Sequence, residues 1–249
     1  MSRAARRSWS WRSSLLALAL GLCAGCGGSG APRTEGPFGD GAAQVWVTHA
    51  RGEPKAVVAI LHGLSPTPQR LDFKRWQRHL ADEGYDVVYP RYEEVRGDPR
   101  ARDGVVAGVR GGLRKLGDPQ APLVLVGHSR GGRLAVEAAA YLKPREAIAI
   151  YPGTINVSYE PPTDFQRIPA ETSIWLVVGD RDEAVGSAGA VELYERLRTF
   201  GIPNAQIHPL VIRSTKRFTA DHLSVYRTDP PAQKAIWARV DSLIRQALF

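Results

Sequence analysis

Ser129 is the residue whose surroundings in the sequence point most clearly to covalent chemistry. It stands at the centre of a Gly-x-Ser-x-Gly motif at 127–131. A serine hydroxyl is a poor nucleophile, and it reacts only when a sharp turn holds it away from its own backbone and facing a base. Side chains at Gly127 and Gly131 would collide in such a turn, so both glycines are expected to be required. The motif predicts attack by Ser129 on an acyl group.

The elements around this motif are those that a sharp strand-to-helix turn needs. The chain alternates short apolar runs with helical patterns, which predicts one domain over 44–249 with an α/β fold. Near-continuous apolar strands suit a mostly parallel sheet of about seven strands with helices on both faces. The expected strands are Val45–Thr48, Ala56–Leu61, Asp86–Tyr89, Leu123–Val126, Ala147–Ile150, Ile174–Val178 and Gln206–Ile212, and the expected helices are Arg70–Glu83, Ala101–Leu116, Gly131–Leu142, Ala188–Phe200 and Ala232–Leu248.

Polar residues follow four of these strands. Beside Ser129, they include Asp180 and Asp182 after the strand at 174–178 and His222 beyond the strand at 206–212. Ligands of parallel sheets bind outside the carboxyl ends of the strands, so these groups are expected to meet there. A serine, a carboxylate and a histidine are the groups that acyl transfer needs.

Together, the motif and this order of groups resemble the α/β-hydrolase superfamily, from about Val45 to the C-terminus. The segment Gly-His-Ser-Arg-Gly-Gly at 127–132 also resembles the turn of chlorophyllase-type esterases, a similarity too short to carry a substrate. The superfamily's triad runs serine, acid, histidine along the chain. The resemblance implies that His222 is the base, in preference to His208, which lies within a predicted strand.

The same resemblance implies that the acid is Asp182, three residues after Gly179. Asp180 is the alternative acid, although such a residue more often caps its loop by accepting backbone N–H bonds. The backbone N–H groups of Leu64 and Arg130 would form the oxyanion hole. The Arg130 side chain could bind an anion or be held in a salt bridge.

The remaining histidines give no second site. His62 and His128 are expected to be structural neighbours of the active site, and no histidine pair has the spacing of metal ligands, so neither a metal nor a cofactor is expected. The segment from Pro152 to Thr172, where related folds carry a cap, shows no helical period. It predicts a loop without a large cap and an open site. Tyr151, Tyr159 and Phe165 could line that site, although packing is the more common role of such residues.

The first residues have the pattern of an export signal. Four arginines precede the apolar run Leu15–Leu22, which is shorter than the about 20 residues of a stable membrane span. The following Leu-Cys-Ala-Gly-Cys at 22–26 resembles the lipobox of bacterial lipoproteins, with Cys23 where an aliphatic residue is usual. The resemblance implies a signal peptide over 1–25 and a cell-envelope protein whose lipid anchor at Cys26 contacts the membrane. Release into the periplasm, secretion and a retained anchor are the alternatives.

The composition and the net charge indicate which classes of partner to expect. The Gly- and Pro-rich residues 26–43 are expected to be a flexible tether. The net charge of +8 falls to +4 without the four leader arginines, and its basic residues are spread over helix faces, so no nucleic-acid partner is expected. The sequence thus predicts a serine hydrolase of small or surface-bound carboxylic esters. A thioesterase, amidase or acyltransferase with the same triad, or a non-catalytic envelope lipoprotein, is the alternative.

Overall fold

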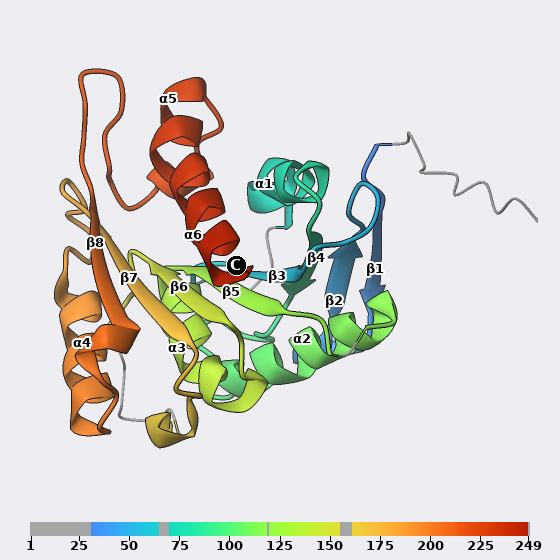
Figure 1. The fold of residues 1–249 in the computed structure, drawn as a ribbon, viewed down its shortest axis with the longest axis horizontal. Coiled ribbons are helices and arrows are strands. Elements are labelled where there is room, and N and C mark those ends of the chain that lie inside the picture. Colours follow the sequence, from blue (N-terminus) through green and yellow to red (C-terminus); the bar gives the residue numbers. More distant parts are fainter. Residues whose placement is uncertain (1–30, 65–69, 119, 155–160, 249) are drawn as a thin grey trace, which may run out of the picture.

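The central element of the fold is an eight-stranded sheet, seen in a computed structural model that describes residues 31–64, 70–118, 120–154 and 161–248 (Figure 1). The strand order is β1-β2-β4-β3-β5-β6-β7-β8, and only β1–β2 and β2–β4 pair antiparallel. The strands are β1 (Thr34–Phe38), β2 (Val45–Thr48), β3 (Val57–Leu61), β4 (Asp86–Pro90), β5 (Leu123–His128), β6 (Glu146–Ile150), β7 (Ser173–Gly179) and β8 (Ile207–Ile212). The expected α/β class with a mostly parallel sheet is confirmed.

Helices cover both faces of the sheet, as the apolar strands predicted. In Figure 1, α1 and α6 lie on one face, and α2, α3 and α4 lie on the other. Strand β3 shows the reason: Val58 and Ile60 pack with α1 and α6, whereas Val57, Ala59 and Leu61 pack with α2 and α3. The helices are α1 (Arg70–Asp82), α2 (Ala101–Leu116), α3 (Arg130–Leu142), α4 (Ala188–Thr199), α5 (Pro230–Ala232), the π-helical η5 (Gln233–Trp237) and α6 (Ala238–Leu248).

The first strand corrects two expectations. The sheet has eight strands instead of about seven, because β1 lies within the segment that was predicted to be a tether. Residues 34–38 and the short 3-10 helix η1 (Gly41–Ala43) pack on the domain, and Thr34 and Thr48 join β1 to β2 by a hydrogen bond of 2.9 Å between their hydroxyls. Residues 26–30 lie outside the described part of the chain.

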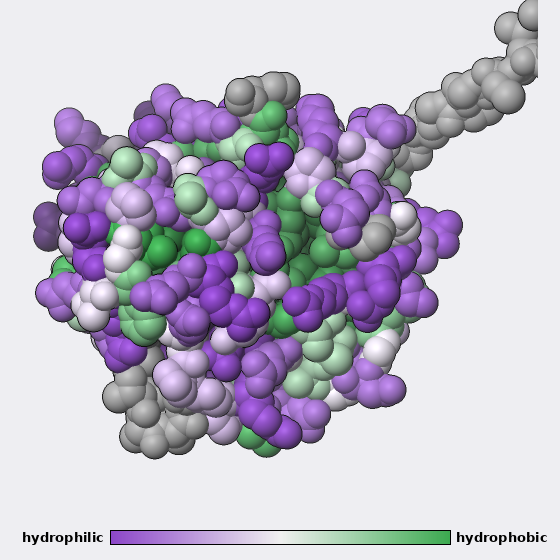
Figure 2. Space-filling view, turned by 60° about the horizontal axis from the view of Figure 1, so that its bottom comes forward, coloured by the Kyte–Doolittle hydropathy of each residue, from purple (hydrophilic) through white to green (hydrophobic). Residues whose placement is uncertain are grey.

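The connection from β6 to β7 carries little regular structure. Within its described part the only helix is the 3-10 turn η2 (Phe165–Arg167), and residues 155–160 lie outside the described ranges. The surface in Figure 2 is mainly hydrophilic, and hydrophobic residues show mostly in recesses between polar ones. No helix in the described part of the chain is long and apolar enough to cross a membrane.

Candidate active site

Ser129 occupies a strained turn between β5 and α3. Its backbone has φ 55° and ψ −122°, a conformation that non-glycine residues adopt only where the surrounding structure enforces it. The Ser129 N–H donates to the Ile150 carbonyl at 2.9 Å, and the Ser129 carbonyl accepts from Gly153 at 3.1 Å and from Arg133 at 3.2 Å. These bonds to β6, to the loop after it and to the first turn of α3 hold the serine at the carboxyl edge of the sheet.

The two glycines of the motif are packed as the sequence predicted. A Cβ atom on Gly127 would overlap the carbonyl group of Gly131, where the chain doubles back into α3. A Cβ atom on Gly131 would overlap the carbonyl oxygens of Leu61 and His62 at the end of β3. Neither neighbour can move without breaking backbone structure, so both positions exclude any side chain.

The structure brings Ser129, His222 and Asp182 into one chain of hydrogen bonds. The Ser129 Oγ lies 3.0 Å from His222 Nε2, and His222 Nδ1 lies 2.9 Å from Asp182 Oδ2. The Asp182 side chain is fully buried, and its Oδ1 accepts the N–H groups of Ala184 at 3.0 Å and Val185 at 3.1 Å. Because a carboxylate can only accept, Nδ1 carries the proton and Nε2 is free to accept from serine.

Asp180 has a different environment. Its Oδ1 accepts from the backbone N–H of Ser214 at 2.9 Å and from the Ser214 hydroxyl at 2.6 Å. These bonds lower the pKa of its exposed carboxyl group. Asp180 therefore caps its loop, which was the second of its two expected roles. The structure places Asp182, and not Asp180, against His222.

His208, the alternative base, does not lie beside Ser129. His208 lies within β8, with its ring 4.6 Å from that of Trp175. His79 on α1 bonds Asp241 on α6 at 2.8 Å, and this bond raises its pKa. Neither ring contacts the serine, so His222 alone of these three is placed to act on Ser129.

His128 is a direct neighbour of the site, as expected. Its buried ring lies between the Tyr226 hydroxyl, 3.0 Å from Nδ1, and the His222 carbonyl, 2.8 Å from Nε2. Burial, followed by the nearby His222, lowers its pKa to about 3. His128 is therefore a neutral ring in contact with the backbone of His222.

The segments expected to form the oxyanion hole lie on either side of Ser129. A Cβ atom on Gly63 would come within 3.5 Å of the Ser129 Cβ, so the loop after β3 reaches the serine just before Leu64. Arg130 opens α3, where the first N–H groups have no partner within the helix. Backbone donors can thus approach the serine from both segments.

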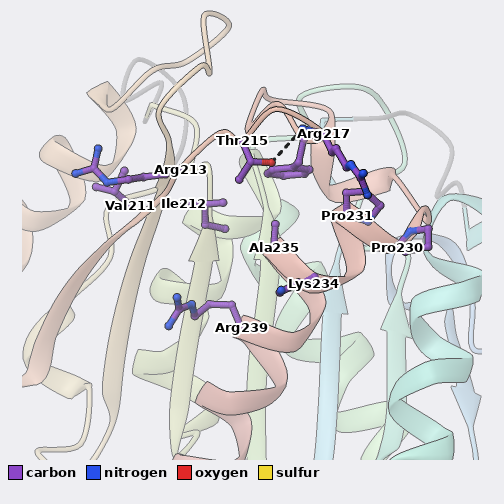
Figure 3. A pocket seen from close by; sticks show the side chains of 11 residues that line it. Val211, Ile212, Arg213, Thr215, Arg217, Pro230, Pro231, Lys234, Ala235 and Arg239 are labelled. Atoms are coloured by element: carbon purple, nitrogen blue, oxygen red, sulfur yellow. Dashed lines mark hydrogen bonds between the residues drawn. The ribbon is translucent and has the colours of Figure 1, made fainter.

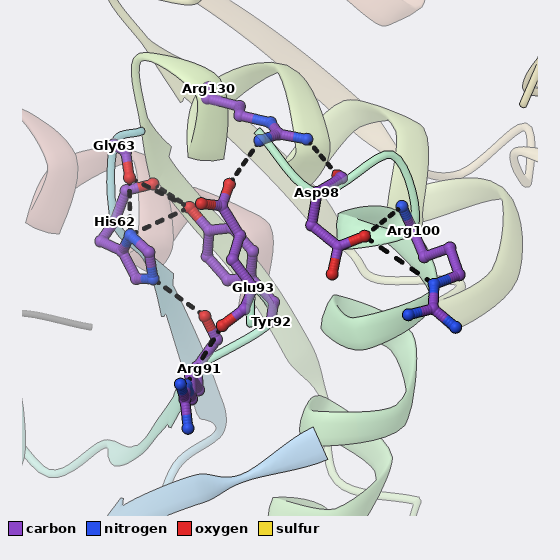
Figure 4. A network of polar contacts seen from close by, with 8 residues as sticks. All are labelled: His62, Gly63, Arg91, Tyr92, Glu93, Asp98, Arg100 and Arg130. Carbon is purple, nitrogen blue, oxygen red and sulfur yellow. Dashed lines mark hydrogen bonds and ion pairs between the residues drawn. The ribbon is translucent and has the colours of Figure 1, made fainter. Parts of the chain in front are cut away.

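The Arg130 side chain is held in a salt bridge, which was one of its two expected roles. Its guanidinium donates to the Glu93 carboxylate at 2.7 Å and to the Asp98 carbonyl at 2.5 Å, in the network drawn in Figure 4. The Glu93 side chain is fully buried. The arginine therefore fixes the start of α3 to the loop after β4.

The same loop also contacts the segment after β3, and the sequence reasoning missed it. The Tyr92 hydroxyl donates to the carbonyl of His62, the two rings stack at 4.2 Å, and Nε2 of His62 bonds the Arg91 carbonyl at 3.0 Å (Figure 4). Burial lowers the pKa of His62. Tyr92 and Glu93 follow a buried strand as the other site residues do, so inspecting every strand end would have found them.

Two of the three aromatic residues named as possible lining, Tyr151 and Phe165, pack in the interior. Tyr151 is fully buried, with its hydroxyl 3.1 Å from that of Ser224, and Phe165 packs edge-on against Phe200. Burial raises the pKa of Tyr151 to about 12. Tyr159 lies outside the described residues.

A separate groove of about 790 Å³ lies between the end of β8 and the helices α5 and α6. Figure 3 shows Lys234 and Arg239 reaching across it from the helical side, with Arg217 above them. It contains none of the three hydrogen-bonded residues of the active site. Among the residues that the structure describes, no group of three or more His, Cys, Asp or Glu could hold a metal ion. Cys26 lies outside the described ranges.

No family model and no curated protein matches this sequence. Solved structures match the fold at low identity. Carboxyl esterase 2 from the mycorrhizal fungus Tuber melanosporum has a TM-score of 0.64 and 17% identity, over 89% of this chain and 88% of its own. Esterase B from Lactobacillus rhamnosis has a TM-score of 0.62 and 14% identity, over 87% of this chain and 85% of its own. An α/β-hydrolase enzyme from a Medee basin deep-sea metagenome library has a TM-score of 0.58 and 16% identity, over 87% of this chain and 97% of its own. The chain has the α/β-hydrolase fold.

Proposed function

We propose that this protein is a serine hydrolase that cleaves carboxylic esters through an acyl-enzyme intermediate. The observation that carries the proposal is the hydrogen-bonded chain from Ser129 through His222 to Asp182, with distances of 3.0 Å and 2.9 Å. A serine that is strained, held at a strand end and bonded to an oriented histidine has the arrangement needed for nucleophilic catalysis.

The chemistry follows from this geometry. The Ser129 Oγ attacks the ester carbonyl carbon while its proton passes to His222 Nε2, and Asp182 stabilises the resulting imidazolium. The tetrahedral intermediate collapses, the C–O bond to the alcohol breaks, and the leaving oxygen takes the proton from Nε2. Water then attacks the acyl-serine in the same way, its proton passing through Nε2 to Ser129 Oγ, and the carboxylic acid is released.

Two backbone N–H groups would stabilise the oxyanion, those of Leu64 and Arg130. The position of Gly63 against Ser129 and of Arg130 at the start of α3 supports these roles. The salt bridge of the Arg130 side chain with Glu93 supports a fixed position for one donor. Such donors contribute about 3–4 kcal/mol each to the transition state.

Two exposed leucines are next in sequence to residues that lie close to Ser129. Leu64 is 44% exposed and follows Gly63, and Leu223 is 64% exposed and follows His222. Apolar side chains at these positions would suit the acyl part of an ester. The solved structures named above are esterases or a hydrolase, and that of esterase B is described together with a tributyrin phosphonate.

The test is hydrolysis of a panel of soluble acyl esters by wild-type protein and by Ser129→Ala. We expect the substitution to lower kcat/KM by about 10⁶-fold, because it removes the nucleophile, while the circular dichroism spectrum stays unchanged. Thioesters and amides in the same panel separate the related activities by their kcat/KM values. A folded wild-type protein that turns over none of these substrates would leave the fold as a binding module and contradict the proposal.

A further inference from the structure

His128 connects the strand of the nucleophile to the backbone of the proposed base. It is the last residue of β5 and the covalent neighbour of Ser129. Its Nε2 lies 2.8 Å from the His222 carbonyl, and its ring centroid lies 4.7 Å from that of His222. The contact therefore joins two residues that are 94 positions apart in the sequence.

The partners of the ring define its tautomer. The His222 carbonyl can only accept a hydrogen bond, so Nε2 must carry the proton. In the neutral ring Nδ1 is then an acceptor, and the Tyr226 hydroxyl, 3.0 Å away, is a donor that fits it. Gly63 leaves room for both groups, since a Cβ atom there would lie 3.1 Å from Nδ1 and 3.2 Å from the Tyr226 hydroxyl.

His222 needs such a contact because of its place in the chain. It lies outside every helix and strand, between β8 and the 3-10 turn η4 (Ser224–Tyr226). Asp182 orients the imidazole of His222 through Nδ1, and Asp221 bonds the residues that follow His222 within the same turn. The bond from His128 joins the His222 carbonyl to the residue next to Ser129.

We infer that His128 is a positioning residue: as a neutral Nε2–H donor, oriented by Tyr226, it sets the position of His222 relative to Ser129. The inference rests on the proposed hydrolase function. The physical reason is that a short path then sets the distance from Ser129 Oγ to His222 Nε2. The path runs from Ser129 through one peptide bond to His128, and from the His128 ring through one hydrogen bond to the His222 carbonyl.

The neutral state of the ring is part of this role. Burial and the neighbouring His222 lower the pKa of His128 to about 3, so it stays uncharged while His222 becomes protonated during the reaction. A charged ring at 4.7 Å would repel the imidazolium of His222. The other titratable groups that act on it are Asp182 after β7, which raises its pKa, and His62 after β3, which lowers it; the Tyr226 hydroxyl faces Nδ1.

The test compares two unbranched replacements in the full chain. In His128→Gln the amide nitrogen can occupy the place of Nε2 and donate to the His222 carbonyl, whereas in His128→Met no donor remains. We expect His128→Met to lower kcat by about a hundredfold with KM within a few-fold, because the base is displaced from the serine. His128→Gln should retain kcat within about tenfold of wild type, and only His128→Met should shift the acid limb of the pH–rate profile.

Equal losses in both variants, or no loss in His128→Met, would overturn the inference. Nitrogen NMR of the wild-type histidines gives a readout that does not depend on turnover: His128 should be a neutral Nε2–H tautomer near neutral pH. A charged ring or an Nδ1–H tautomer would overturn the inference even if ester hydrolysis is found. An inactive wild type with the expected tautomer would instead contradict the hydrolase proposal.

Discussion

At the scale of single residues, His222 joins two groups that are distant in the sequence. Ser129 lies 93 residues and Asp182 lies 40 residues before it, yet all three meet within hydrogen-bond distance. Each comes from the loop after a different strand, and this placement is what makes the three side chains a candidate triad.

The two aspartates after β7 provide a matched pair of substitutions. Asp182→Asn should lower kcat by about 10⁴-fold, because the amide can hold His222 in the wrong tautomer. Asp180→Asn keeps a capping group on Ser214 and should change kcat only a few-fold. Steady-state kinetics of both variants measure kcat. A larger loss of kcat for Asp180→Asn than for Asp182→Asn would contradict the assignment of Asp182 as the acid.

The sequence was informative about these residues where a motif fixes the spacing. The serine motif, and the position of Asp182 three residues after Gly179, led to residues that the structure brings together. Glu93 and Tyr226 belong to no such motif. The only local signal for Glu93 is its place after a buried strand, and no local pattern marks Tyr226. Their contacts with Arg130 and His128 join segments 37 and 98 residues apart.

At the scale of elements, the buried strands were predictable and the edge strand was not. Strands β3 and β6 are buried at every residue, so the apolar runs of the sequence identify them. Strand β1 contains only one large apolar residue, Phe38, and its residues are half-buried or exposed. Its pairing with β2 depends on tertiary contacts, and the composition of this segment resembles that of a linker.

The start of β6 predicts a pH dependence of stability. Glu146 is buried, and burial raises its pKa to about 8, despite a hydrogen bond from the Trp175 indole. In the unfolded chain the carboxyl group ionises near its ordinary value of 4.5. At a pH between these two pKa values, folding requires the Glu146 carboxylate to take up a proton. The contribution of Glu146 to the free energy of unfolding is therefore full below about pH 4.5 and is lost as pH rises to about 8.

Glu146→Gln should remove this part of the pH dependence, because the amide stays neutral at every pH. We expect the variant to gain roughly 3–5 kcal/mol relative to wild type between about pH 5 and pH 8.5. Urea unfolding at both pH values measures the free energies. Glu195→Gln on the exposed face of α4 is the control and should follow wild type; parallel curves for Glu146→Gln and wild type would show that Glu146 is ionised in the fold.

At the scale of the whole molecule, the fold agrees with the class read from the sequence. The alternation of strands and helices predicted a parallel sheet covered on both faces, and the structural neighbours have the same architecture over more than four-fifths of the chain. The location of the protein is a separate proposal, because it depends on the first residues. We propose that lipidation of Cys26 anchors the domain in the cell envelope.

Replacing the proposed anchor tests that location. Cys26→Ser should move the protein from the membrane fraction to the soluble fraction of cells, because it removes the only thiol that could carry the lipid at this position. Cys23→Ser is the matched control and should stay in the membrane fraction. Fractionation followed by immunoblotting measures both, and membrane retention of Cys26→Ser would contradict lipid anchoring at this residue.

The central claim is that Ser129 is a nucleophile activated by His222, and covalent labelling tests it most directly. The wild-type protein is treated with a fluorophosphonate, and its intact mass and labelled peptide are measured by mass spectrometry. The account predicts one adduct per chain, located on Ser129, with labelling abolished in Ser129→Ala and slowed by orders of magnitude in His222→Ala. A folded wild-type protein that forms no adduct, or forms it at another residue, would contradict the account.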